Sequence, residues 1–99
     1  MKNLEGKVRS YLEYCEVQKR LDGKTLKAYR IDLRQFLEQM VDVEITVDLL
    51  EGYIGKLHEK FKPKTVKRKI ASLKAFFHYL EYKEMIDRNP FNKIQVHFR

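Results

Sequence analysis

Positively charged side chains gather in one segment of this 99-residue chain, where they could bind a polyanion. Residues 60–80 contain no aspartate or glutamate. The cations of this segment are Lys60, Lys62, Lys64, Lys67, Arg68, Lys69 and Lys74. The formal net charge of the whole chain is +7, so the remainder is close to neutral and the excess charge is concentrated here. Lysine and arginine attract phosphate and displace its counterions, so this segment favours binding to DNA, RNA or anionic lipid.

Residue types that could support catalysis or metal binding are present, but their arrangement does not favour either. The histidines His58, His78 and His97 are far apart and lack metal-ligand spacing with the single cysteine, Cys15. None of the six tyrosines has an adjacent base or an arginine–histidine set that could activate it as a nucleophile. The four glycines form no phosphate-binding loop. We therefore predict that this chain is not an enzyme by itself and needs no metal or cofactor.

The composition indicates a single domain. A length of 99 residues and a hydrophobic content of 43% are enough for one buried core. A lone cysteine cannot form an internal disulfide, so Cys15 is expected to be a buried thiol on a helix face, in a reducing compartment. No targeting segment and no apolar run of about 18 residues is visible, which predicts a cytoplasmic protein without a membrane partner.

The apolar spacing is helical almost throughout, so we predict an all-α fold, a compact bundle of four main helices. We expect these helices over residues 3–19, over 25–40, from Thr46, and over 63–82. Asp22-Gly23 favours a turn, and a short fifth helix or a turn is expected over residues 83–88. Beyond Asn89-Pro90, apolar residues alternate with polar ones up to Arg99, a strand-like period.

The helix over residues 63–82 has two distinct faces. Apolar residues recur at steps of four and three and form a stripe that should face the core: Val66, Ile70, Leu73, Phe77 and Leu80. The opposite side carries Lys64, Lys67, Arg68, Ala71, Lys74, Ala75 and His78, with Thr65 and Ser72 at its edge. Long cations combined with two small alanines would let the helix backbone approach a partner closely.

The helix over residues 25–40 has a similar division. Its buried stripe is expected to contain Leu26, Tyr29, Leu33, Phe36, Leu37 and Met40. To one side of that stripe lie Lys24, Lys27, Arg30 and Arg34, with Ile31 among them. The chain therefore carries two basic helix faces.

Three segments, in order, resemble a known module. Residues 25–37 read TLKAYRIDLRQFL and are similar to the family helix T-x-x-x-Y-x-x-D-L-x-x-F. Residues 64–80 read KTVKRKIASLKAFFHYL and are similar to the helix T-x-x-R-x-x-A-x-L-x-x-F-F-x-Y-L. Asn89-Pro90-Phe91 is similar to the N-P element that closes the module. Together they resemble the SAM-like, core-binding N-terminal domain of tyrosine recombinases and phage integrases, over about residues 4–94.

The resemblance implies a bundle that forms one arm of a clamp around double-stranded DNA, with its second and fourth helices facing the major groove. The implied DNA-binding residues are Lys24, Thr25, Lys27, Arg34, Lys64, Thr65, Lys67, Arg68, Ser72 and Lys74. The first helix would contact other recombinase subunits. Residues 1–94 would form the core-binding domain, and residues 95–99 would begin an interdomain linker.

The resemblance does not extend to catalysis. The family cuts and rejoins DNA with a C-terminal domain that holds an arginine–lysine–histidine set and a tyrosine nucleophile, and none of these maps onto the 99 residues. Two other readings stay open: a helical module that binds an acidic protein, and a stand-alone accessory DNA-binding protein. RNA is a weaker candidate, because no exposed aromatic platform interleaves with the basic residues.

Overall fold

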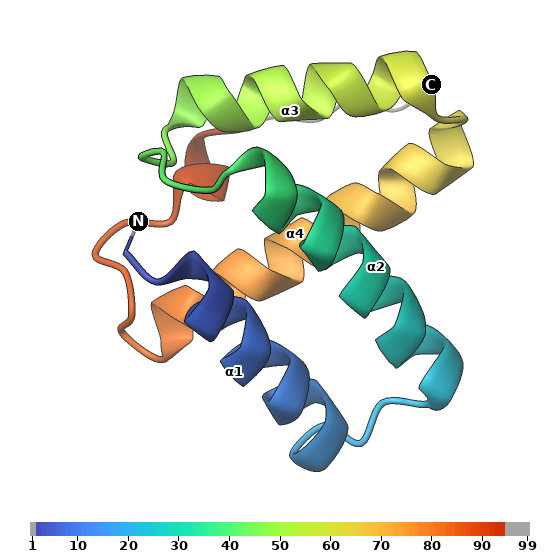
Figure 1. Cartoon of the computed structure of the whole chain (residues 1–99), viewed down its shortest axis with the longest axis vertical. Coiled ribbons are helices and arrows are strands. Elements are labelled where there is room, and N and C mark those ends of the chain that lie inside the picture. The colour runs from blue at the N-terminus through green and yellow to red at the C-terminus, as the bar shows by residue number, and fades with distance from the viewer. Residues whose placement is uncertain (1, 95–99) are drawn as a thin grey trace. The chain divides into compact units, whose positions relative to one another are not determined.

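The computed structural model describes residues 2–94, which form α-helices and no β-strand. In chain order they are α1 (Leu4–Val17), α2 (Gly23–Gln39), α3 (Val47–Lys60) and α4 (Pro63–Tyr82), followed by the 3-10 helix η1 (Pro90–Lys93) (Figure 1). The prediction of an all-α fold with four main helices is confirmed. The predicted linker at residues 95–99, and the strand-like alternation beyond Ile94, lie outside the described residues.

The chain divides into two compact units, of which the first ends at Glu44. In this unit α1 and α2 contact each other and run in opposite directions (Figure 1). The rings of Tyr11 on α1 and Tyr29 on α2 stack with centroids 6.4 Å apart. The thiol of Cys15 forms no disulfide and is fully buried, which agrees with the prediction of a buried thiol on a helix face.

The start of α2 differs from the prediction. Asp22 is the N-cap, and its carboxylate accepts hydrogen bonds from the backbone N–H of Thr25 at 2.8 Å and from the Thr25 hydroxyl at 3.2 Å. Gly23 is therefore the first helical residue rather than part of a turn. Aspartate favours both turns and N-caps, because its side chain bonds nearby backbone donors in either setting.

The second unit contains α3, α4 and η1. Thr46 caps α3 through its hydroxyl, which accepts from the backbone N–H of Leu49 at 3.2 Å, and Pro63 is the first residue of α4. These starts agree with the helices expected from Thr46 and from residue 63. Phe77 on α4 contacts Phe76 and Phe91, with ring centroids 5.4 Å apart in each pair. These aromatic contacts tie η1 to α4 in the core of this unit.

The fifth element lies later in the chain than predicted. After α4 the chain makes a turn in which Glu84 has a positive φ of 57°, and the only further helix within residues 2–94 is η1. Asn89 is buried, and its side-chain oxygen accepts from the backbone N–H of Phe91 at 3.0 Å. This bond holds the Asn-Pro-Phe segment so that Phe91 points into the core of the unit. The motif therefore contributes to the fold by placing a buried aromatic side chain.

Replacing Gly52 or Gly55 by alanine is expected to stabilise the chain by about 0.5–1 kcal/mol each, because glycine is a poor helix former. Both lie inside α3 on its exposed side, and a methyl group at either position meets no atom within 4 Å. Urea unfolding would measure the change.

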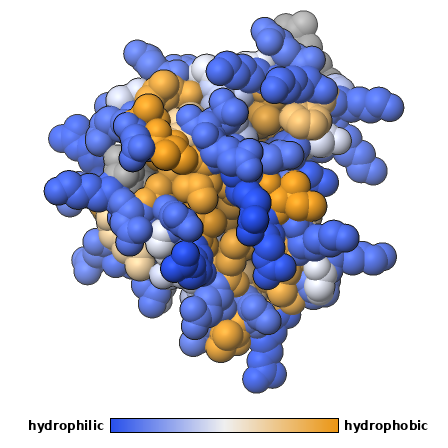
Figure 2. All heavy atoms as spheres, viewed as in Figure 1, coloured by the Kyte–Doolittle hydropathy of each residue, from blue (hydrophilic) through white to orange (hydrophobic). Residues whose placement is uncertain are grey.

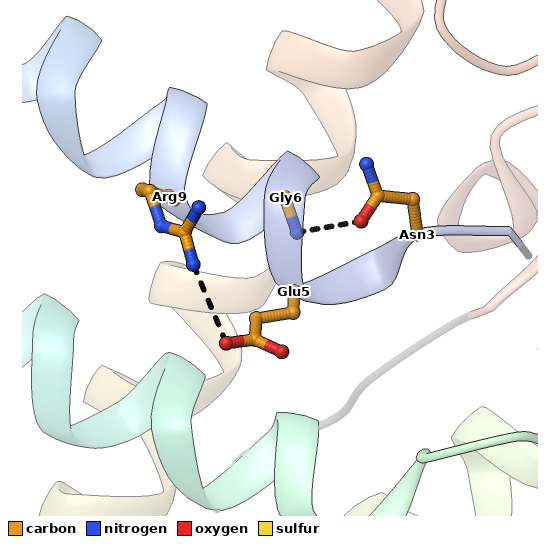
Figure 3. Close-up of polar contacts among 4 residues, drawn as sticks. All are labelled: Asn3, Glu5, Gly6 and Arg9. Carbon is orange, nitrogen blue, oxygen red and sulfur yellow. Dashed lines mark hydrogen bonds and ion pairs between the residues drawn. The ribbon is translucent and has the colours of Figure 1, made fainter.

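Gly6 provides a matched control in α1. A methyl group there would collide with the side chain of Asn3, which caps α1 by accepting from the Gly6 N–H at 3.2 Å (Figure 3). Gly6→Ala should therefore show no comparable gain. A lower free energy of unfolding for Gly52→Ala would contradict the finding that a methyl group at position 52 meets no neighbouring atom.

Candidate nucleic-acid interface

The exposed side of α4 is a continuous basic surface. Its exposed cations are Lys64, Lys67, Arg68 and Lys74, joined by Ala71 and His78. The opposite half of the helix is buried, including the five residues of the predicted stripe. The first carboxylate along this exposed side is that of Glu81, in the last turn. The predicted basic face of α4 is therefore accessible in the structure.

Helical geometry arranges this surface as a shallow centre with cations on both sides. At about 100° per residue, Ala71 lies near the centre line of the exposed sector, while half-buried Ala75 lies toward one edge. Lys67 and Lys74 lie to one side of that line and Arg68 to the other. The distance along the axis from Lys64 to Lys74 is about 15 Å. A partner could therefore approach the backbone at Ala71 while cations extend on both sides of it.

The first turn of α4 strengthens the positive field. Lys62 is the N-cap and makes no side-chain capping bond, and the first turn contains no acidic residue. The N-terminus of a helix carries a partial positive charge and free N–H groups, which favour anions. Here Lys64 adds a full positive charge to that end instead of neutralising it.

Two predicted contact residues of α4 are less accessible than expected. Ser72 is fully buried, and its hydroxyl donates to the backbone carbonyl of Arg68 at 3.2 Å, so its predicted place at the edge of the exposed face is wrong. Thr65 is half-buried. Lys69, counted among the cations of this segment, is only 4% exposed, and its ammonium lies 4.8 Å from the ring centroid of Phe61. Lys69 therefore stabilises the fold through a cation–π contact rather than adding to the surface.

The basic face of α2 is exposed as well. Lys24, Lys27 and Arg34 are all exposed, while Thr25 is half-buried and engaged with Asp22. Exposed Arg30 belongs to the same face but was not among the predicted contact residues, although its spacing from Lys27 and Arg34 could have identified it. The basic face of α2 belongs to the first unit of the chain and that of α4 to the second.

A mixed-charge groove of about 590 Å³ runs between α1 and α2. Its lining residues are Glu5, Val8, Arg9, Leu12, Glu13, Glu16, Arg30, Arg34, Leu37 and Glu38. Arg9 also pairs with Glu5 at 3.4 Å (Figure 3). The carboxylates of α1 would repel a phosphate backbone, so the groove is not a continuation of the basic face of α2. Arg34 belongs to both, because it lines the groove and lies on that basic face.

The buried tyrosine and cysteine of α1 are not activated groups. Burial raises the pKa of the Tyr11 phenol, and a hydrogen bond with Cys15 raises it further. Burial also raises the pKa of the Cys15 thiol, against a smaller lowering by Tyr11. Both groups are protonated at neutral pH and are poor nucleophiles.

Hydrophilic side chains cover most of the face shown in Figure 2. Across residues 2–94, no helix is both long and apolar enough to cross a membrane. In the same part of the chain, no three histidine, cysteine or carboxylate side chains converge as a metal-binding group.

Residues 8–84 match the family described as phage integrase, N-terminal SAM-like domain. A tyrosine recombinase of Agathobacter rectalis is 62% identical over 102 aligned residues, which cover the whole of this chain and 33% of the relative. Tyrosine recombinase XerD of Listeria innocua is 34% identical over 90% of this chain and 33% of its own length. Tyrosine recombinase XerC of Herpetosiphon aurantiacus is 32% identical over 88% of this chain and 31% of its own length.

The chain thus spans about a third of the length of the curated relatives that it matches. No solved structure gives a significant match. The family match covers most of the chain and includes all of α2, α3 and α4. It therefore includes both basic faces, which lie on α2 and on α4. The chain belongs to the phage integrase N-terminal SAM-like domain family.

Proposed function

We propose that this chain binds duplex DNA as the N-terminal arm of a site-specific tyrosine recombinase. The observation that carries the proposal is the exposed side of α4, where four cations surround the small side chain of Ala71 and no carboxylate intervenes before Glu81. A helix of this kind fits the major groove of B-DNA, in which lysine and arginine reach phosphates and guanine edges. The names of the matched relatives, all tyrosine recombinases, support the same role.

The proposed contact residues are the accessible members of the predicted set. On α4 they are Lys64, Lys67, Arg68 and Lys74, and on α2 they are Lys24, Lys27 and Arg34. Thr25 and Thr65, both half-buried, would contribute at the edges. In this proposal strand cleavage depends on a family catalytic domain, because no catalytic set of the family maps onto these residues.

Titration of a duplex with the 99-residue chain across a salt series tests the proposal. If about six phosphates are engaged, the logarithm of the association constant should fall against the logarithm of the salt concentration with a slope near −5. Heparin serves as the comparison polyanion. Duplex DNA should bind more tightly than heparin at equal charge, because the groove offers base edges as well as phosphates.

The second candidate is a polypeptide-binding module, which the groove between α1 and α2 favours because it offers charges of both signs around Val8, Leu12 and Leu37. Contacts with other recombinase subunits through α1 would use the same surface. If duplex DNA bound no better than heparin, or without a steep salt dependence, this second candidate would replace the first.

A further inference from the structure

The cationic face of α2 exposes one large apolar side chain. Ile31 is 44% exposed. Lys27 lies four residues before it and Arg34 three residues after it, and both are exposed. Residues three and four apart are neighbours on a helix surface, so Ile31 is flanked by two long cations along the helix axis.

Isoleucine at this position brings little benefit to the free chain. Nearly half of its side chain remains in water, so much of its apolar area contributes nothing to folding. Its branching at Cβ also restricts the side chain in a helix, which makes it a poorer helix former than the lysine and arginine residues around it. The position would gain most from a partner that covers the isoleucine.

Three other exposed apolar side chains, on α3 and in the segment after α2, have different surroundings. Leu49 on α3 is 40% exposed, but it has no cation within four residues in either direction. Val41 and Val43 lie in the segment after α2, on either side of Asp42. A phosphate backbone would not be drawn to either place, whereas the neighbours of Ile31 attract one.

We propose that Ile31 contacts the 5-methyl group of thymine in the major groove, an inference that rests on the DNA-binding function proposed above. The cations beside it would bring α2 against the phosphates on the groove walls. Among the base edges of the major groove, the thymine methyl is the apolar group presented to a helix. Ile31 is therefore a specificity-determining residue that favours A·T pairs, while its cationic neighbours bind any sequence.

Uracil substitution tests this contact, because uracil differs from thymine only by the missing 5-methyl group. The chain is titrated into an alternating A·T duplex and into the same duplex with every thymine replaced by uracil. We expect affinity to fall about fourfold for each methyl group contacted, which corresponds to about 0.8 kcal/mol. A G·C duplex with 5-methylcytosine should correspondingly bind more tightly than one with cytosine.

Two variants assign the effect to Ile31. Ile31→Ala retains a good helix former at an exposed site, and it should bind the thymine and uracil duplexes almost equally. Leu49→Ala removes a similarly exposed apolar side chain from α3, and it should keep the preference of the native chain.

The outcomes separate this inference from the function on which it rests. If the native chain bound both A·T duplexes equally, or if Ile31→Ala kept the full preference for thymine, the contact would be refuted while DNA binding stood. If the chain bound none of the duplexes at low salt, the proposed function itself would fail.

Discussion

Changing Lys64, Lys67 and Arg68 together to glutamate is expected to lower the affinity for duplex DNA about 500-fold in 0.1 M salt. The loss of three phosphate contacts makes the slope of the logarithm of the association constant against the logarithm of the salt concentration shallower by about 2.7. In 0.1 M salt, each unit of this slope corresponds to about a tenfold change in the association constant. Repulsion between the new carboxylates and the phosphates would add to this loss. Fluorescence anisotropy with a labelled duplex would measure it, and circular dichroism would verify that the exposed substitutions leave the helices intact.

A second triple variant controls for net charge. Lys19, Lys56 and Lys93 are exposed and lie outside α2 and α4. Changing them to glutamate takes the formal net charge from +7 to +1, as the first variant does. If binding depends on the α4 surface, the control should retain most of the affinity. Equal losses in both variants would show that overall charge, and not this surface, governs the binding.

Phe77→Ala is expected to destabilise the chain by about 3–5 kcal/mol. The Phe77 ring is fully buried in the second unit, where it contacts Phe76 edge-on and packs against Phe91 of η1. Its removal leaves a cavity and loosens the attachment of η1 to α4. Because small domains have only about 5–15 kcal/mol of total stability, much of this variant should be unfolded at 37 °C.

Tyr82→Ala is the matched control on the same helix. Tyr82 lies in the last turn of α4 and is 70% exposed, so its truncation should change the free energy of unfolding by less than about 0.5 kcal/mol. Urea unfolding followed by helical circular dichroism compares the two variants. A small effect of Phe77→Ala would contradict its place in the core.

The sequence predicted the helices well where local signals are strong. The start of α4 follows from Pro63, whose ring fits only the first turn, and its core stripe follows from the four-and-three spacing of apolar residues. The start of α2 was placed two residues late, because an aspartate before a glycine is compatible with a turn as well as with a cap. Local sequence does not distinguish the two, since the choice depends on the tertiary packing of the helix that the aspartate would cap.

The width of the buried face was harder to predict than its centre. The stripe from Val66 to Leu80 was identified, yet Phe76, Tyr79 and Ser72 beside it are also buried. Periodicity locates the middle of a core-facing surface, but how far it extends depends on the surrounding packing. For the same reason, a serine that looked accessible in the sequence forms an intrahelical hydrogen bond instead.

The sequence also identified the exposed cations of α4 correctly, but it did not show that Lys69 is buried. Lys69 lies in a run of three basic residues, and nothing local marks it as different from Lys67 and Arg68. Its long aliphatic stem is buried while its charge meets an aromatic face supplied by the segment before α4. Such a contact depends on the fold and leaves no signal in the spacing.

Under the proposed function, the first turn of α4, which is cationic and has no side-chain cap, lowers the stability of the free helix but favours binding to a polyanion. Replacing a lysine there with a carboxylate or a capping residue would make the unbound helix firmer, because like charges at a positive helix end repel. A bound polyanion relieves that repulsion. Under the proposed function, part of the free energy of DNA binding would come from relief of the charge repulsion at the start of the unbound helix.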